Sequence, residues 1–188
     1  VNLVDFDLLE LINSLRGQSY FLESLMQILS NNLFGLFLAF FVVPYFFFRS
    51  QEKFFWIFAA WLVTVGITDF SANFLKSYFL DFRPCFSDYS YLLDSKGHLL
   101  NQCSASLTGM PSNHSANFFA GALFLLTVFK INRYSLIFLL VSCFVALSRI
   151  YLGKHFPYQV LVGVSYGSFL GLLGGYLYLK ILSRNSLN

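Results

Sequence analysis

Charged residues are scarce in this chain. Only 11% of its 188 residues are Asp, Glu, Lys or Arg, whereas 57% are hydrophobic, and the mean hydropathy is +0.65. A soluble domain of this length could not bury so much apolar surface, so the composition excludes an ordinary water-soluble globular protein. We therefore expect one integral membrane domain over residues 1–188, built as an all-α, polytopic helix bundle.

Histidine and cysteine are also rare, with three residues of each. No group of them has the spacing of a structural or catalytic metal site, so we expect no metal and no other cofactor. The basic start of a cleavable signal peptide is lacking as well, and we expect none. Acidic residues stand in its place, at Asp5, Asp7, Glu10 and Glu23.

Long apolar runs are what the chain does have. They predict about five membrane-spanning helices, over residues 33–48, 54–80, 115–129, 134–152 and 158–181. Before them, residues 3–29 form two short amphipathic pieces separated at Gly17. These pieces either lie in the membrane interface, as an interfacial segment over residues 1–30, or pack on the bundle as an ordinary helix. Residues 81–113 are mixed in polarity and are predicted to form a loop.

Glycines recur every four residues in the last apolar run, and such a stripe lets another backbone approach closely. They are Gly163, Gly167, Gly171 and Gly175. We favour packing inside the bundle over a seam between two copies, and the sequence does not define the oligomeric state.

The short connections between the spans carry basic residues on one face of the membrane. The positive-inside rule assigns this face to the cytoplasm, so the loop over residues 81–113 is expected on the opposite, extracytoplasmic side. The basic residues are Arg49, Lys53, Lys130, Arg133, Lys180 and Arg184. Cys85 and Cys103 lie in that loop, where an oxidising compartment permits a disulfide, and we favour the bridge over two free thiols. Cys143 falls within a span and is expected to be a small core residue.

Three short motifs place cations and histidines on the extracytoplasmic face. The first is Lys76 followed after six residues by Arg83-Pro84, and the second is Pro111-Ser112-Asn113-His114. The third is Ser148-Arg149 followed after five residues by His155. In this order they resemble the three signatures of the type 2 phosphatidic acid phosphatase family. The chain departs from that family at Asn113, where Gly is usual, and at Gln159, where the third signature normally ends in Asp.

The local chemistry of these motifs suits a phosphate. Ser112 or Asn113 is a natural N-cap, and the free N–H groups of the helix turn that follows form an anion site. Pro157 is suited to the first position of a helix, which leaves His155 just outside that helix. Phosphoryl transfer requires positive charge and donors around the phosphate oxygens, which Lys76 and Arg149 can supply.

The resemblance implies a role for each motif residue. His155 would be the nucleophile that forms a phosphohistidine, and His114 would protonate the departing oxygen and later help to activate water. The phosphate would be held by Lys76, Arg83, Ser112, Asn113 and Arg149.

Gln159 leaves open what supports His155. Its amide oxygen can accept the imidazole N–H and orient the ring, in which case Gln159 belongs to the catalytic residues, or it can cap the last helix. Asp69, a carboxylate inside the second span, is a possible substitute for the missing charge. The alternative for Asp69 is a local hydrogen bond to Asn73 or to a neighbouring span.

The resemblance implies a metal-independent phosphatase that acts on a lipid phosphate or pyrophosphate. It also implies a location in the inner membrane of a bacterium, with the lipid bilayer and the lipid substrate as partners and no nucleic acid partner. Candidate substrates are phosphatidylglycerol phosphate, undecaprenyl pyrophosphate and lipid A 1-phosphate, and the compact size is similar to that of bacterial enzymes such as lipid A 1-phosphatases. One alternative is a phosphotransferase that passes the phosphoryl group to another lipid. Another is a pseudoenzyme that only binds lipid phosphates, as Gln159 would suggest.

Overall fold

The computed structural model is an all-helical bundle and describes residues 3–49, 53–84 and 107–185. The expected all-α class is confirmed, and no strand occurs in these ranges. The described helices are α1 (Leu3–Asn13), α2 (Tyr20–Leu29), α3 (Asn32–Arg49), α4 (Phe54–Phe79), α5 (Asn113–Phe129), α6 (Arg133–Tyr151) and α7 (Pro157–Asn185).

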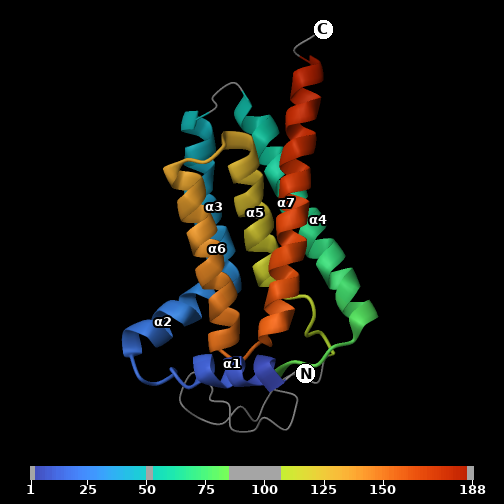
Figure 1. Cartoon of the computed structure of the whole chain (residues 1–188). Coiled ribbons are helices and arrows are strands. Elements are labelled where there is room, and N and C mark those ends of the chain that lie inside the picture. Colours follow the sequence, from blue (N-terminus) through green and yellow to red (C-terminus); the bar gives the residue numbers. More distant parts are fainter. Residues whose placement is uncertain (1–2, 50–52, 85–106, 186–188) are drawn as a thin grey trace.

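Helices α3 to α7 form the body of the bundle, and α1 and α2 lie across one of its ends (Figure 1). Among the described residues α4, α6 and α7 are each long and apolar enough to cross a membrane, and α2 with the first part of α3 forms a pair bent by 79° that could make a fourth span. With α5, which has 17 residues, these helices match the five predicted apolar runs to within a few residues. The chain breaks between α1 and α2 around Gly17, whose φ of +74° suits a residue without Cβ.

The outer surface of the bundle is apolar, which fits a hydrocarbon surrounding. Phe55 and Phe70 on α4 are each 78% exposed, and Phe169 on α7 is 62% exposed. Soluble monomers rarely leave large contiguous apolar patches open to water, so a lipid environment accounts for this surface. Cys143 lies on the same surface, and the expectation that it is a core residue was wrong.

Helix α5 is enclosed by α4, α6 and α7, and its contact with α7 is the tightest of these. A Cβ at Gly167 would lie 2.0 Å from the carbonyl oxygen of Ala116, and a Cβ at Gly171 would lie 2.4 Å from that of Ala120. The glycine stripe of α7 therefore packs inside the bundle, backbone against backbone, as small-residue helix contacts do. This contact also brings the first turns of α5 and α7 together, because the Ser112 N–H donates to the Gln159 carbonyl at 3.2 Å.

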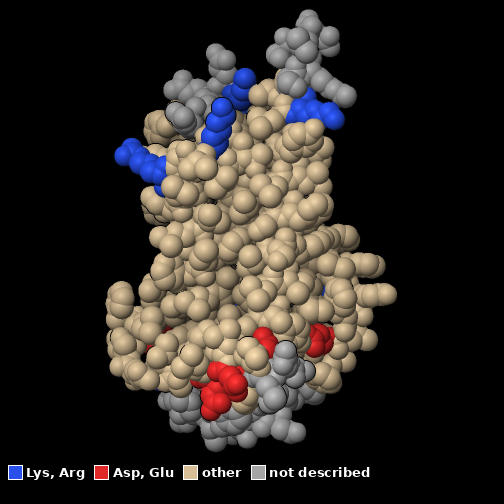
Figure 2. All heavy atoms as spheres, in the orientation of Figure 1, with Lys and Arg blue, Asp and Glu red and all other residues tan. Residues whose placement is uncertain are grey.

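On the face shown in Figure 2, the surface charges at the two ends of the molecule differ in sign. Lysine and arginine side chains gather at the end opposite α1, whereas aspartate and glutamate side chains gather at the α1 end. At the end opposite α1, Lys53 precedes α4, Lys130 follows α5, Arg133 begins α6 and Lys180 lies near the end of α7.

We predict that Gly167→Ala lowers the free energy of unfolding by about 1–3 kcal/mol, because the added methyl group meets a backbone oxygen that cannot rotate away. Thermal unfolding of the purified protein in detergent micelles measures the effect. The matched control is Gly66→Ala on α4, where a Cβ meets no atom within 4 Å. Equal melting temperatures for the two variants would contradict the assigned role of the glycine stripe.

Candidate active site

The three motifs meet where four helices end. Lys76 lies in the last turn of α4 and Arg149 in the last turn of α6. His114 is in the first turn of α5, and His155 lies two residues before α7 begins at Pro157. Helix α4 ends at Phe79, and the left-handed backbone of its C-cap Leu80 (φ 46°) turns the chain toward Arg83. Residues that are up to 79 positions apart in the sequence, Lys76 and His155, therefore reach one place.

A cavity of about 700 Å³ joins these side chains. At the motif end its walls include Lys76, Arg83, Asn113, His114, Arg149 and His155. From there it extends between the helices, where apolar side chains such as Leu36 and Val65 line it. A cavity that is cationic at one end and apolar along its length can take an anionic head group and a hydrocarbon chain together.

His155 is held by a backbone carbonyl. It is only 2% exposed, and its Nδ1 lies 2.8 Å from the carbonyl oxygen of Gly109. Because a carbonyl oxygen only accepts, Nδ1 carries the proton and Nε2 is left unprotonated. Burial, together with the positive charges of Arg149, Arg83 and Lys76, holds the pKa of His155 well below its ordinary value, so the ring is neutral and nucleophilic.

Gln159 caps the last helix and does not contact the His155 ring through its amide oxygen. That oxygen accepts from the Phe156 N–H at 3.0 Å, while Nε2 donates to the Asp81 carboxylate at 2.8 Å and to the Phe82 carbonyl at 2.6 Å. Gln159 was interpreted either as a residue that orients His155 or as a helix cap. The hydrogen bond from the Phe156 N–H to its amide oxygen is a capping bond, as in a capping box.

Gly109, which contacts His155, belongs to none of the three motifs. A Cβ there would lie 2.4 Å from Gln159 Nε2 and 2.6 Å from the Phe82 carbonyl oxygen, so only glycine fits this place. The Gly109 N–H also donates to the Asp81 carbonyl at 2.8 Å. Gln159 and the Asp81–Phe82 segment thus pack against Gly109 and fix its position. Because the Gly109 carbonyl contacts the His155 ring, they also position this ring indirectly.

Four cations surround the site without carboxylate partners in the described part of the chain. Arg149 Nη1 donates to the carbonyl oxygen of Ser30 at 3.1 Å and to the Ser30 hydroxyl, and Arg83 makes a long 3.5 Å contact with the Thr108 carbonyl. The fourth cation is Lys154, which was not predicted as a phosphate-binding residue although it directly precedes His155. Its Nζ lies 3.4 Å from Ser30 Oγ.

Repulsion among these cations acts on Lys154, because burial and the charges of Arg149 and Arg83 lower its pKa to about 8. The pKa of Arg83 is lowered by burial. Positive groups that destabilise one another in this way are stabilised by an arriving anion.

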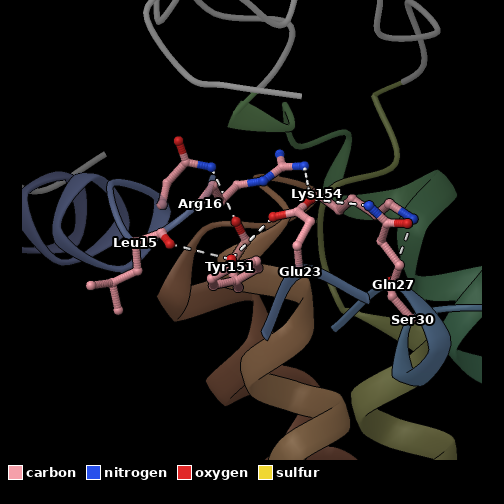
Figure 3. A network of polar contacts seen from close by, with 8 residues as sticks. Leu15, Arg16, Glu23, Gln27, Ser30, Tyr151 and Lys154 are labelled. Atoms are coloured by element: carbon pink, nitrogen blue, oxygen red, sulfur yellow. Dashed lines mark hydrogen bonds and ion pairs between the residues drawn. The ribbon is translucent and has the colours of Figure 1, made fainter. Parts of the chain in front are cut away.

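The N-terminal helices hold this cationic end in place (Figure 3). Arg16 and Glu23 form an ion pair at 2.8 Å, and the Tyr151 hydroxyl at the end of α6 donates to Glu23 at 3.1 Å. Ser30, which ends α2, accepts from Lys154 in the same network. Leu9 and Met26 are buried against the bundle, whereas Tyr20 and Phe21 are exposed, so α1 and α2 combine a packed face with an outward apolar face.

The second motif divides between the cavity and the interior. Ser112 is fully buried, does not line the cavity and receives a hydrogen bond from the Ser115 hydroxyl at 3.0 Å, so its side chain lies behind the expected phosphate position. Asn113 does line the cavity and donates to Asp69 at 3.0 Å. Asp69 is bonded to asparagine side chains and not to His155, which is the local alternative considered for it.

Some expected features lie outside the described residues, among them Cys85, Cys103 and most of the loop over residues 81–113. Within the described ranges no three His, Cys, Asp and Glu side chains gather as the ligands of a metal ion.

Comparison with known proteins relates the chain to membrane phosphatases. It is 29% identical over 128 residues to a lipid A 1-phosphatase of Rhizobium etli, covering 66% of this chain and 52% of that protein. It is also 29% identical over 137 residues to a lipid A 4'-phosphatase of Porphyromonas gingivalis, covering 72% of this chain and 57% of that protein. The chain thus spans about half the length of the curated relatives it matches.

A solved structure shares the fold. The transmembrane PAP2 type phosphatidylglycerolphosphate phosphatase of Bacillus subtilis superposes with a TM-score of 0.68 at 22% identity, over 95% of this chain and 86% of that one. The sequence profile of the PAP2 superfamily matches residues 56–183, a range that contains all three motifs and more than half of the chain. The resemblance to the type 2 phosphatidic acid phosphatases is confirmed, and the chain is a multi-pass membrane protein that belongs to the PAP2 superfamily.

Proposed function

We propose that the protein is a membrane phosphatase that removes phosphate from a lipid phosphate or pyrophosphate through a phosphohistidine. The observation that carries this proposal is that two histidines and the cations Lys76, Arg83 and Arg149 line the same cavity, which continues between apolar side chains. The matched lipid A phosphatases and the phosphatidylglycerolphosphate phosphatase support a lipid substrate.

The reaction would proceed in two steps. In the first, His155 Nε2 attacks phosphorus while the bond to the lipid oxygen breaks, and His114 gives its proton to that oxygen. In the second, His114 takes a proton from water, which attacks the phosphohistidine and releases inorganic phosphate and the free imidazole. Lys76, Arg83 and Arg149 would stabilise the charge that spreads over the phosphate oxygens in both steps.

We propose that the chemistry needs no metal ion, because the cations already supply the charge that phosphoryl transfer requires. The pseudoenzyme alternative rested on Gln159. The hydrogen bond from His155 to Gly109 weakens that alternative, because it gives the imidazole an orienting acceptor without a carboxylate.

The active site is proposed to face away from the cytoplasm, toward the periplasm or the cell exterior, in the inner membrane of a bacterium. The collection of lysine and arginine at the opposite end of the bundle supports this orientation.

We predict that His155→Ala lowers phosphate release by ~10⁴-fold or more, since the nucleophile is lost while binding groups remain. The rate at which the purified protein releases inorganic phosphate from a panel of lipid phosphates measures this loss. Wild type incubated with a substrate that carries a labelled phosphate should also become labelled, through an acid-labile bond. His98→Ala is the control, because His98 belongs to none of the three motifs. Full activity of His155→Ala would refute the assignment.

Gln159→Ala should lower turnover by roughly 10- to 100-fold, because Gly109 loses its support and the His155 ring shifts. The loss is expected to be similar for every lipid phosphate, as befits a positioning residue. Gln18, an exposed glutamine bonded to the Ser14 carbonyl, provides the control Gln18→Ala. A wild-type rate of turnover in Gln159→Ala would show that Gln159 is not needed to position Gly109 and the His155 ring.

The orientation predicts that a cysteine introduced at Ser95, in a background without the natural cysteines, reacts with a membrane-impermeant thiol reagent in intact cells once any outer barrier is opened. A cysteine introduced at Lys130 is the matched control and should react only after lysis. The reverse pattern would overturn the topology.

A further inference from the structure

The guanidinium of Arg149 is anchored by the N-terminal part of the chain. Its Nη1 donates to the carbonyl oxygen of Ser30 at 3.1 Å and also to the Ser30 hydroxyl. Both residues are buried, although 119 positions separate them in the sequence. A guanidinium is planar and carries five N–H donors in a fixed fork, so fixing one nitrogen fixes the direction of the others. Arg149 lines the cavity, whereas Ser30 is not among the lining residues.

Ser30 occupies the position that ends α2. Its N–H donates to the Met26 carbonyl at 3.0 Å, and the chain then bends by 79° into α3. The last carbonyl groups of a helix have no partner within that helix, so the Ser30 carbonyl is open to a donor from outside. The end of α2 therefore offers the arginine two uncharged oxygens, the carbonyl and the hydroxyl of one residue.

Helix α2 is itself fixed against α6, the helix that carries the arginine. Met26 of α2 and Val145 of α6 belong to the same buried apolar cluster. A polar contact adds to this attachment, because the Tyr151 hydroxyl of α6 donates to Glu23 of α2 at 3.1 Å (Figure 3). The acceptor and the arginine thus lie on two helices that pack directly against each other, so the guanidinium has one defined place.

The anchor carries no charge, unlike the carboxylate that commonly pairs with a buried arginine. A carboxylate would form a charge-assisted pair with the guanidinium and offset its positive charge. Glu23, the carboxylate of this network, is bonded instead to Arg16 at 2.8 Å and to the Tyr151 hydroxyl. Ser30 Oγ also lies 3.4 Å from Lys154 Nζ, so two cations share one neutral oxygen. Their positive charge is left for an arriving anion.

We infer that Ser30 is a positioning residue of the active site, through which α2 holds Arg149 in place without neutralising the charge that phosphate binding uses. Ser30 belongs to none of the three motifs and acts through Arg149, without touching the substrate. The inference also assigns a part in phosphate binding to α2, which lies before the range that the PAP2 profile matches. It rests on the proposed phosphatase function and concerns how that site binds phosphate.

The test measures the affinity of the purified full chain in detergent micelles for inorganic phosphate, by isothermal titration calorimetry. The melting temperature of each variant is measured in phosphate-free buffer. Ser30→Ala removes the hydroxyl and should weaken phosphate binding about 10-fold, because Arg149 loses one of the hydrogen bonds that position it.

Ser30→Asp keeps an acceptor but adds a negative charge beside Arg149 and Lys154. Phosphate binding should weaken by roughly 10- to 100-fold, because the carboxylate competes with phosphate for both cations. The melting temperature should rise, because the same two cations gain a carboxylate. Opposite changes in stability and phosphate affinity distinguish a positioning role from a structural one, since damage to the fold would lower both.

Ser19→Asp is the matched control on the same helix. Ser19 is the exposed N-cap of α2, where its Oγ accepts from the Leu22 N–H, and Asp is equally suited to that position. The phosphate affinity of this variant should equal that of wild type.

Wild-type phosphate affinity in either Ser30 variant would overturn the inference and leave the proposed function intact. A parallel fall of affinity and melting temperature in Ser30→Asp would have the same meaning. The proposed function is tested separately, by phosphate release from phosphatidic acid, farnesyl diphosphate and lipid A. No release from any of these lipids by wild type would overturn the proposed function and the inference together.

Discussion

The close contact between α5 and α7 is the constraint on which the other features depend. Because Gly167 and Gly171 let the two backbones touch, the first turns of both helices are brought to one level and are joined by the hydrogen bond from Ser112 to Gln159. His114 leaves one of these turns and His155 lies just before the other. The distance between the two imidazoles is thus set by the packing of α5 against α7 at Gly167 and Gly171, deeper in the bundle, and not by the loops around the imidazoles.

The cationic end needs a different kind of support. Repulsion among Lys76, Arg83, Arg149 and Lys154 would spread an unsupported loop, and no carboxylate in the described ranges pairs with them. Ser30, at the carbonyl end of α2, accepts from two of the four and so offers partial negative charge without a full neutralising ion. A carboxylate in that place would bind the arginine more strongly but would compete with phosphate for it.

The helices and the motif residues were predictable, whereas their supports were not. The length of each apolar run in the sequence predicts the length of a helix. The spacing of the motif residues Lys76, Arg83, Arg149 and His155 is also read directly from the sequence. The acceptor for His155 is the backbone of Gly109, and a carbonyl group leaves no mark in a sequence because every residue has one. Gln159 invited a direct role because it occupies a familiar position, but its amide oxygen is engaged by the adjoining Phe156 N–H. The resemblance implied a phosphate-binding role for Ser112, which stays a prediction, and the burial of its side chain beside Ser115 was not evident from the sequence.

The hydrogen bond from His155 to Gly109 also bears on the surroundings in which the protein can work. A carboxylate in that role would take up a proton in acid and release its hold on the imidazole, whereas a peptide carbonyl does not titrate at any pH that a cell meets. A side-chain acceptor can be lost by a single codon change, but the peptide oxygen persists through any substitution that keeps the backbone path. The group that accepts the imidazole N–H therefore does not itself titrate, and it is inherited with the path of the backbone.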